Sequence, residues 1–384
     1  MSATSETISS AETPLIFVVG ARGVPDVEGG AEKNAEMLFP LVVESGSYRV
    51  TLVGLSDNIK SETFKGVQLM KAPRSNFMKT DKLLCYVASI FMAMRLRPRI
   101  VHFQGLGSAI FLWAYKLMGA KTVVRYGSAD YLVEKWGPLG KLGFLFAEFQ
   151  LRFADAVIAV TPALAERLAR RGIKGNVHVI ANAADPLPAI GPGPGHPTGD
   201  YILTVGRVTA QKNIANLLRG YELFAKDAVK PPKLIIAGGL DETEYVDELR
   251  PLLTERTVLA GKFTRSAMAP LYRDSKLYVN ASLHEGSSNA VLEAIGAECS
   301  ILLSDIPENR DFGLPAKSYF DPSSPEAIAD ALKRALSDRG AYVVDSARYL
   351  TWAKVAERTL DIYRGIAPLK QAEVERRSAL ASAS

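Results

Sequence analysis

Short apolar runs alternate with longer amphipathic stretches along most of the chain. Residues 15–20 (LIFVVG) are apolar and rich in β-branched side chains, which predicts a buried strand. Residues 31–46 have helical spacing and end at a glycine. Further strands are predicted at 48–55, 66–73, 99–105, 121–127, 156–161 and 177–182. Strands that alternate with helices in this way indicate a parallel sheet with helices on both faces.

The alternation stops once and then starts again. Residues 184–200 are dense in proline and glycine and show no periodicity, which is typical of a linker. Beyond this segment, strands are predicted at 201–206, 233–238, 257–261, 277–282 and 300–305, and the last helical stretch at 344–363. The pattern therefore favours an α/β chain with two tandem, doubly wound, Rossmann-like domains.

We expect the two domains to face a cleft, with ligand at the C-terminal ends of the strands. The first domain would comprise residues 1–183, the linker 184–199 and the second domain 200–350. A C-terminal helix, at about 351–384, would pack back on the first domain.

Composition excludes several classes of protein. Of the 384 residues, 48% are hydrophobic and 23% charged, as in ordinary globular domains. Residues 1–14 lack the basic and apolar regions of a signal peptide, and no apolar run reaches the roughly 20 residues of a membrane-spanning helix. Cys85 and Cys299 lie in apolar surroundings, which predicts two buried thiols, and no Cys/His cluster has metal-ligand spacing. We expect a cytoplasmic protein.

The net charge of +5 becomes informative where it is concentrated. Residues 71–99 contain seven basic residues and one acidic residue, or +6. With Phe77, Met78 and an apolar helix, this segment is suited to an anionic membrane surface at the inner face of the plasma membrane. A buried helix with basic ends explains the pattern equally well. Nucleic-acid binding is not expected, because the basic residues are not interleaved with exposed aromatic residues.

The first strand leads into a glycine-rich loop and then a helix. Gly29 and Gly30 leave backbone N–H groups bare where that helix begins, which favours an anion. The spacing differs from the dinucleotide fingerprint GxGxxG, and a purely structural role for these glycines is an open alternative.

A second strand ends at Gly206 and is followed by Arg207 and Lys212. Asn213 is placed to cap the helix that begins near Ile214. Two cations and a helix N-terminus at one point would neutralise a diphosphate. The alternative is an ordinary pair of surface cations.

A third strand end carries two glutamates eight residues apart, Glu285 and Glu293. Between them a short turn exposes N–H and hydroxyl groups before a helix, as suits phosphate; its residues are Gly286, Ser287, Ser288 and Asn289. Glu293 is flanked by apolar residues, where a carboxylate is costly unless it accepts hydrogen bonds, and ribose hydroxyls would satisfy it. An ordinary helix-surface glutamate is the alternative.

Taken together, these motifs resemble the retaining nucleotide-sugar glycosyltransferases of family 4, which have the GT-B fold. The GR-x4-K element contains Arg207 and Lys212, and the E-x7-E element contains Glu285 and Glu293. Similar segments are GGAE (29–32), VIAN (179–182), IIAGG (235–239) and the closing segment 351–366. The resemblance covers roughly residues 15–366, and the opening loop is most similar to bacterial surface-polysaccharide members.

The resemblance implies sugar transfer from a nucleoside-diphosphate donor with retained anomeric configuration and with neither metal nor other cofactor. Arg207 and Lys212 would clamp the diphosphate, Glu285 would face the donor sugar and Glu293 would bind the ribose. The other donor-binding residues would be Gly29, Gly30, Gly206 and the turn 286–289. The acceptor, expected to be a lipid-linked saccharide, would bind the first domain.

The sequence departs from the family pattern at several positions. Tyr126-Gly127 replaces a His-Gly pair, so a histidine acid/base at that position is unavailable, although front-face transfer does not require one. Tyr126 and Asp130 would orient donor or acceptor, and His102 either faces the cleft or belongs to the core. EGSS replaces the family's EGFG, a segment that bears on sugar recognition. The identity of the donor sugar therefore does not follow from the family resemblance. A non-catalytic nucleotide-sugar sensor or scaffold and a GT-B-like sugar-nucleotide epimerase are the alternatives.

Overall fold

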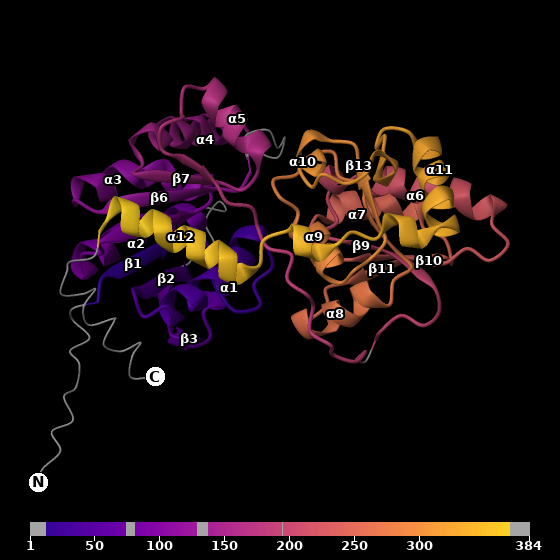
Figure 1. The fold of residues 1–384 in the computed structure, drawn as a ribbon, viewed down its shortest axis with the longest axis horizontal. Coiled ribbons are helices and arrows are strands. Elements are labelled where there is room, and N and C mark those ends of the chain that lie inside the picture. Colours follow the sequence, from indigo (N-terminus) through magenta and orange to yellow (C-terminus); the bar gives the residue numbers. More distant parts are fainter. Residues whose placement is uncertain (1–12, 74–80, 129–136, 194, 369–384) are drawn as a thin grey trace, which may run out of the picture. The chain divides into compact units, whose positions relative to one another are not determined.

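The computed structural model describes residues 13–73, 81–128, 137–193 and 195–368, which divide into two compact units (Figure 1). Unit 1 contains the chain up to Ala159, Leu168–Ile180 and the chain from Ala353 onward. Unit 2 contains Val160–Arg167 and Ala181–Trp352. Each unit is built around its own sheet.

Unit 1 contains an eight-stranded sheet in the order β3-β4-β2-β1-β5-β6-β7-β8. Its strands are β1 (Leu15–Val19), β2 (Arg49–Leu55), β3 (Thr63–Phe64), β4 (Val67–Ala72), β5 (Ile100–Gln104), β6 (Lys121–Tyr126), β7 (Ala156–Ala159) and β8 (Val177–Val179). All pair in parallel except β3, which runs antiparallel to β4. The apolar β1 is buried along its whole length, as a central strand covered on both faces must be.

The helices of unit 1 cover this sheet. They are α1 (Gly30–Glu44), α2 (Asp81–Leu96), α3 (Leu112–Leu117), α4 (Pro138–Gln150), the C-terminal end of α5 (Pro162–Arg170) and α12 (Trp352–Ile366). The last of these comes from the far end of the chain: the hydroxyl of Tyr363 on α12 lies 2.6 Å from Nδ1 of His102 on β5. In Figure 1 α12 is the yellow helix that crosses the indigo and purple strands.

Unit 2 contains a six-stranded parallel sheet in the order β11-β10-β9-β12-β13-β14. Its strands are β9 (Tyr201–Val205), β10 (Lys233–Ala237), β11 (Thr257–Gly261), β12 (Leu277–Asn280), β13 (Ile301–Ser304) and β14 (Tyr319–Phe320). Its helices are α6 (Ile214–Asp227), α7 (Thr243–Leu249), α8 (Arg265–Arg273), α9 (Asn289–Gly296), α10 (Pro307–Arg310) and α11 (Pro325–Ser337).

Alternate residues of the unit 2 strands supply two separate cores. Ile202 belongs to the core under α6 and α11, whereas its neighbour Leu203 belongs to the core under α8 and α9. Successive side chains of a strand point to opposite faces, so both faces of the sheet are covered by helices. This confirms the predicted fold class of two doubly wound, Rossmann-like α/β halves.

The predicted start of the last helix is wrong. The pattern places helix from residue 344, but α12 begins at Trp352. Two short 3₁₀ turns, Arg339–Tyr342 and Ser346–Arg348, occupy the region before it. The carboxylate of Asp345 accepts the backbone N–H of Ala347 at 2.9 Å. Such local side-chain hydrogen bonds compete with helix formation, and the spacing of apolar residues does not reveal them.

Two further expectations concern the cysteines and the membrane. Cys85 and Cys299 are both buried free thiols, as predicted. In the described part of the chain, no helix combines the length and the apolar character needed to span a bilayer.

Candidate functional site

At the C-terminal end of β9 in unit 2, two glycines let neighbouring backbone segments approach closely. Gly206 (φ +147°) follows β9 and Gly238 (φ +154°) follows β10. A Cβ atom on Gly238 would overlap the carbonyl oxygen of Gly206, so the two backbones approach as only glycine allows. A Cβ atom on Gly206 would lie 3.1 Å from Cε of Lys212. The Lys212 side chain therefore lies directly against the Gly206 backbone.

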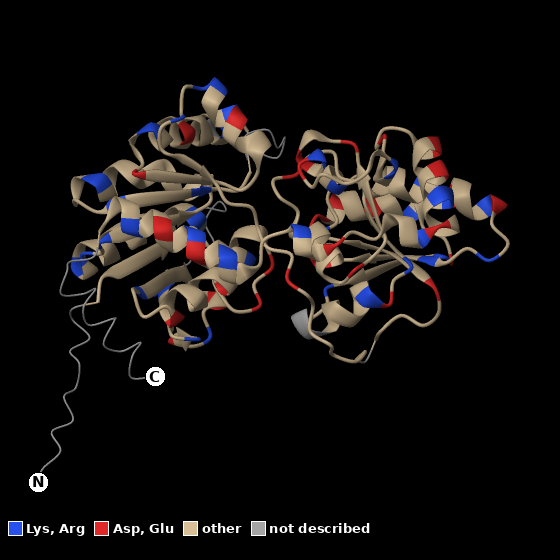
Figure 2. Ribbon diagram, viewed as in Figure 1, with Lys and Arg blue, Asp and Glu red and all other residues tan. Residues whose placement is uncertain are grey.

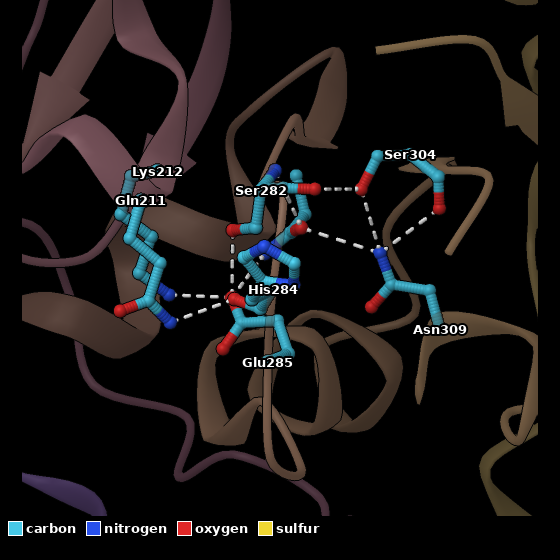
Figure 3. A network of polar contacts seen from close by, with 8 residues as sticks. Gln211, Lys212, Ser282, His284, Glu285, Ser304 and Asn309 are labelled. Atoms are coloured by element: carbon cyan, nitrogen blue, oxygen red, sulfur yellow. Dashed lines mark hydrogen bonds and ion pairs between the residues drawn. The ribbon is translucent and has the colours of Figure 1, made fainter. Parts of the chain in front are cut away.

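Lys212 and Glu285 form an ion pair at this sheet edge. Nζ of Lys212 lies 2.5 Å from Oε1 of Glu285, and the two side chains are only 20% and 9% exposed (Figure 3). The same oxygen accepts the hydroxyl of Ser282 at 2.7 Å and the amide of Asn280 at 3.3 Å. Although burial alone raises the pKa of Glu285, Lys212, Ser282 and Asn280 hold that pKa below its ordinary value. Glu285 is therefore a fixed carboxylate next to a fixed cation.

A second set of polar contacts holds the loop that carries Glu285. Ser304 at the end of β13 donates its hydroxyl to the carbonyl of Ser282 at 2.6 Å. Asn309 on α10 donates to the backbone oxygen and the hydroxyl of Ser304 at 3.0 and 2.9 Å. From the opposite side, Gln211 donates to the carbonyl of His284 at 2.7 Å (Figure 3). The loop is thus fixed from two elements that are distant in the sequence.

These supporting residues were not predicted from the sequence. Asn280 and Ser282 had a signal, since both come at the end of the apolar strand LYVN. Ser304 also ends an apolar strand, and Asn309 lies in a four-residue helix without periodicity. A small pocket at the same edge is lined by Gly206, Lys212, Asn280, Ser282 and their neighbours.

The remaining predicted residues of unit 2 lie around this edge and differ in exposure and in hydrogen bonding. Arg207 is exposed directly after Gly206. The turn 286–289 precedes α9, with buried Ser288 at the N-cap and Asn289 at the first helical position. Asn289 accepts a hydrogen bond from Asn182 at 3.0 Å. Glu293 is half-buried and accepts the hydroxyl of Tyr272 at 2.8 Å.

The prediction that the Asn213 side chain caps the following helix is wrong. Asn213 does stand at the N-cap of α6, but its side chain makes no cap hydrogen bond. The backbone is left-handed there (φ 56°), and the side-chain amide donates to the carbonyl of Pro322 at 2.8 Å. Asparagine is one of the residues that tolerate this backbone conformation.

In unit 1 the glycine-rich loop is tied to the helix it precedes. Gly29 (φ +140°) is the N-cap of α1, which begins at Gly30. Glu32 on the first turn of α1 accepts Nε and the backbone N–H of Arg22 at 2.8 and 3.1 Å. One turn later, Glu36 accepts the backbone N–H of Asp26 at 3.0 Å. The loop conformation therefore depends on two glutamates of α1.

His102 and Tyr126 are core residues: of the two alternatives for His102 the core one holds, and the expectation that Tyr126 orients donor or acceptor is wrong. Both are completely buried. His102 lies between the rings of Phe39 and Tyr363, and burial, with the charge of Arg125, lowers its pKa to about 3. Tyr126 donates its hydroxyl to buried Glu148 at 3.0 Å. Polar residues on strands can therefore serve internal pairing instead of chemistry. Asp130 lies outside the described residues.

Two family models match the chain, one for each half. "Glycosyltransferase Family 4" matches residues 29–186, and "Glycosyl transferases group 1" matches residues 193–351. The chain belongs to glycosyltransferase family 4. The matches include GGAE (29–32) and the Lys212–Glu285 pair, and therefore cover the glycine-rich loop and the sheet edge of this family-4 chain.

Curated relatives of this family-4 chain match at low identity. The alpha-maltose-1-phosphate synthase of Mycobacterium tuberculosis is 27% identical over 252 residues, which is 56% of this chain and 64% of the relative. The serotype-specific mannosyltransferase WbdA of Escherichia coli is 26% identical over 173 residues, or 42% of this chain and 21% of the relative. The aligned parts thus span less than two thirds of either relative.

Solved structures show the shared GT-B fold. HepE of Anabaena, in complex with UDP, has a TM-score of 0.71 at 13% identity, covering 92% of this chain and all of that chain. Sucrose-phosphate synthase of Thermosynechococcus elongatus has a TM-score of 0.67 at 18% identity, covering 97% of this chain and all of that chain.

In this family-4 chain the sheet edge offers two kinds of chemistry. Lys212 and exposed Arg207 supply positive charge that matches a phosphate-bearing group. Glu285 supplies a carboxylate whose negative charge is maintained by its neighbours. Among the described residues, no group of three or more His, Cys, Asp and Glu side chains is arranged to hold a metal ion.

Proposed function

We propose that this chain transfers a sugar from a nucleoside-diphosphate donor to a saccharide acceptor carried on a lipid, with retained anomeric configuration and without a metal ion. The observation that carries the proposal is the Lys212–Glu285 pair, held within 2.5 Å at the end of β9. The HepE structures, which are complexes with UDP and with UDP-glucose, support this donor class. The O-antigen mannosyltransferase relatives support a role in surface-polysaccharide synthesis.

In the proposed reaction the donor diphosphate takes up the positive charge of Lys212 and Arg207. The bond between the anomeric carbon and the diphosphate oxygen breaks, and a bond to the acceptor hydroxyl oxygen forms on the same face of the sugar. The acceptor proton passes to the departing phosphate oxygen, so no histidine base is needed. Fixed cations at the developing negative charge stabilise the transition state, because they are oriented before the reaction begins. Glu285 would contact the donor sugar, and Glu293 would bind the ribose hydroxyls in place of the Tyr272 hydroxyl.

The test is removal of one cation at a time. We expect Lys212→Met and Arg207→Ala each to lower turnover of the donor by about a hundredfold or more, as loss of one preorganised donor does in other enzymes. Lys276→Ala is the matched control: its ion pair with Asp200 (3.2 Å) lies where β12 and β9 begin, at the opposite sheet edge. Near-normal turnover in Lys212→Met, with folding verified by circular dichroism, would contradict the proposed role of Lys212 in binding the donor diphosphate.

The donor class and the stereochemistry need separate measurements. Thermal-shift screening with UDP, GDP and ADP should give stabilisation by one of them, since a ligand at 100 times its Kd adds about 2.7 kcal/mol. NMR of the fresh product should show the anomeric configuration of the donor, and activity should survive EDTA. An inverted product contradicts the retaining mechanism, and loss of activity in EDTA contradicts metal independence.

A further inference from the structure

Large apolar side chains are exposed along one side of α4 and the 3₁₀ turn that follows it (Leu151–Phe153). We call this set the α4 face; it consists of Leu142, Leu145, Phe146, Phe149 and Phe153. Each side chain is between 39% and 62% exposed. The spacing of 3, 4, 7 and 11 residues from Leu142 places all five on one side of a helix. Exposed apolar clusters of this kind mark interaction surfaces.

The opposite side of α4 is firmly attached to unit 1. Gln150 is buried, accepts the backbone N–H of Trp113 at 3.0 Å and donates to the carbonyls of Ala109 and Ile110 at 3.1 and 2.7 Å. Ala147 and Leu151 are completely buried. The orientation of α4 is therefore set by packing and hydrogen bonds, and the α4 face points outward as a consequence.

The apolar surface continues onto the neighbouring helices. α3 contacts both α4 and α2, and the three form one layer in unit 1. On α3, Trp113 is 51% and Leu117 80% exposed; on α2, Phe91 is 62% and Met94 56% exposed. Each pair is separated by three or four residues and so lies on one side of its helix. Residues 74–80, including Phe77 and Met78, lie outside the described residues.

The charges around this layer are almost entirely positive. Residues 81–121, which begin with α2, contain six basic residues and one acidic residue, Asp81. On α4 and its 3₁₀ turn, Lys141 and Arg152 are exposed, whereas Glu148 is buried and paired with Arg171 at 2.9 Å. Two of these bases, Lys116 on α3 and Lys121 at the start of β6, pair with Asp155. Figure 2 marks the basic positions of these helices in blue.

Apolar and cationic groups are combined within single contacts as well. The guanidinium of Arg152 lies 5.0 Å from the centre of the Phe149 ring, which is cation–π distance. An arginine stem laid along an aromatic ring can keep its charge in water while the ring enters an apolar phase. A surface with apolar side chains at its centre and cations around it matches an anionic lipid interface.

We propose that the α4 face, with the adjoining exposed residues of α2 and α3, docks unit 1 on an anionic lipid membrane. A second copy of the chain is the less favourable occupant, because a symmetric contact would bring two positively charged layers together. The inference rests on the proposed function only in that a lipid-linked acceptor would be found at such a surface. The sequence pattern predicts a membrane contact in segment 71–99, whereas this proposal places the main contact on α4.

Vesicle flotation with the full chain tests the proposal. We expect binding to mixed phosphatidylcholine–phosphatidylglycerol vesicles at low salt, and little binding to pure phosphatidylcholine. Phe146→Ser/Phe149→Ser should weaken partitioning at least about tenfold, because both rings lose their apolar contact with lipid. The matched control is Leu223→Ser/Val229→Ser, two exposed apolar residues of unit 2 that should leave partitioning unchanged.

Trp113 gives a direct readout of contact. Brominated anionic lipids should quench its fluorescence, and the quenched component should be absent in Trp113→Phe. Absence of binding to anionic vesicles, or unchanged binding in Phe146→Ser/Phe149→Ser, overturns the proposal. So does a dimer, detected by sedimentation, that these two substitutions dissolve. Nucleotide thermal shifts are measured on the same proteins: a shift without vesicle binding rejects only the docking surface, and vesicle binding without a shift rejects only the proposed function.

Discussion

The imidazole of His102 is surrounded so completely that only its neutral form fits the core of unit 1. Its ring lies 5.4 Å from that of Phe39 and 5.9 Å from that of Tyr363, centre to centre. Burial is the main cause that lowers its pKa to about 3, and the nearby charge of Arg125 adds to it. A histidine in the unfolded chain has a pKa of about 6.5. The two states therefore bind protons differently over a wide range of pH.

This difference predicts how stability depends on pH. As the pH falls below about 6.5, the unfolded chain takes up a proton at His102 that the folded chain refuses until about pH 3. The free energy of unfolding should therefore fall by about 1.4 kcal/mol for each pH unit in this range from this residue alone. His102→Gln should remove that part of the slope in urea unfolding between pH 6.5 and 4.5. Exposed His178→Gln is the control, and equal slopes in His102→Gln and the unsubstituted chain would contradict the prediction.

At the scale of elements, helices with strong local signals were predictable and short ones were not. α11 (Pro325–Ser337) carries such signals, because Ser324 caps it by accepting the N–H of Ala327 at 3.1 Å and proline follows at the first position. β3 and β14 contain two residues each, too few for any periodicity. They form because a neighbouring strand supplies partners for their backbone hydrogen bonds.

The candidate site divides in the same way. Lys212 and Glu285 were predictable because each lies in the segment that follows a strand, and parallel strands bring their C-terminal ends to one edge. Asn309 was not predictable, since its role depends on the placement of α10 beside β13 in the folded unit. Tyr126 ends β6 and shares the strand-end signal, His102 lies in the middle of β5, and only their packing shows that both are buried.

The loop before α1 is an element whose shape depends on charge. Glu32 is buried, accepts two N–H groups of Arg22 and provides negative charge near buried Arg125. Both bonds go to one oxygen, Oε1; a neutral amide in its place loses the ion pair with Arg22 and leaves the charge of Arg125 less compensated. Glu32→Gln should therefore lower the free energy of unfolding by about 2–3 kcal/mol and speed amide exchange in residues 20–29.

The control for this prediction is Glu44→Gln, the same substitution at an exposed position at the end of α1. It should change stability by less than about 0.5 kcal/mol. If both variants unfold at the same urea concentration and exchange alike over residues 20–29, Glu32 does not hold the loop.

At the scale of the whole molecule, the chain builds two units, each with its own sheet and core. Unit 2 is almost continuous in sequence, whereas unit 1 is completed only when α12, the last described helix, packs on it. Tyr363 carries much of that packing: it is fully buried, bonds His102 and makes an edge contact with the ring of Tyr48. Burial raises its pKa well above the ordinary value, in keeping with a hydroxyl that stays protonated.

Separate cores predict separate consequences of a cavity. Tyr363→Ala should cost about 3–5 kcal/mol, as large-to-small changes of buried aromatic residues do, and should accelerate amide exchange in β1, β5 and α12 of unit 1. Tyr221→Ala is the matched change in unit 2, where the fully buried ring on α6 donates its hydroxyl to Pro232 at 2.8 Å. It should accelerate exchange around β9, β10 and α11 instead. Hydrogen-exchange mass spectrometry of both variants measures this directly, and faster exchange spread equally over both units in either variant would show that the cores unfold together.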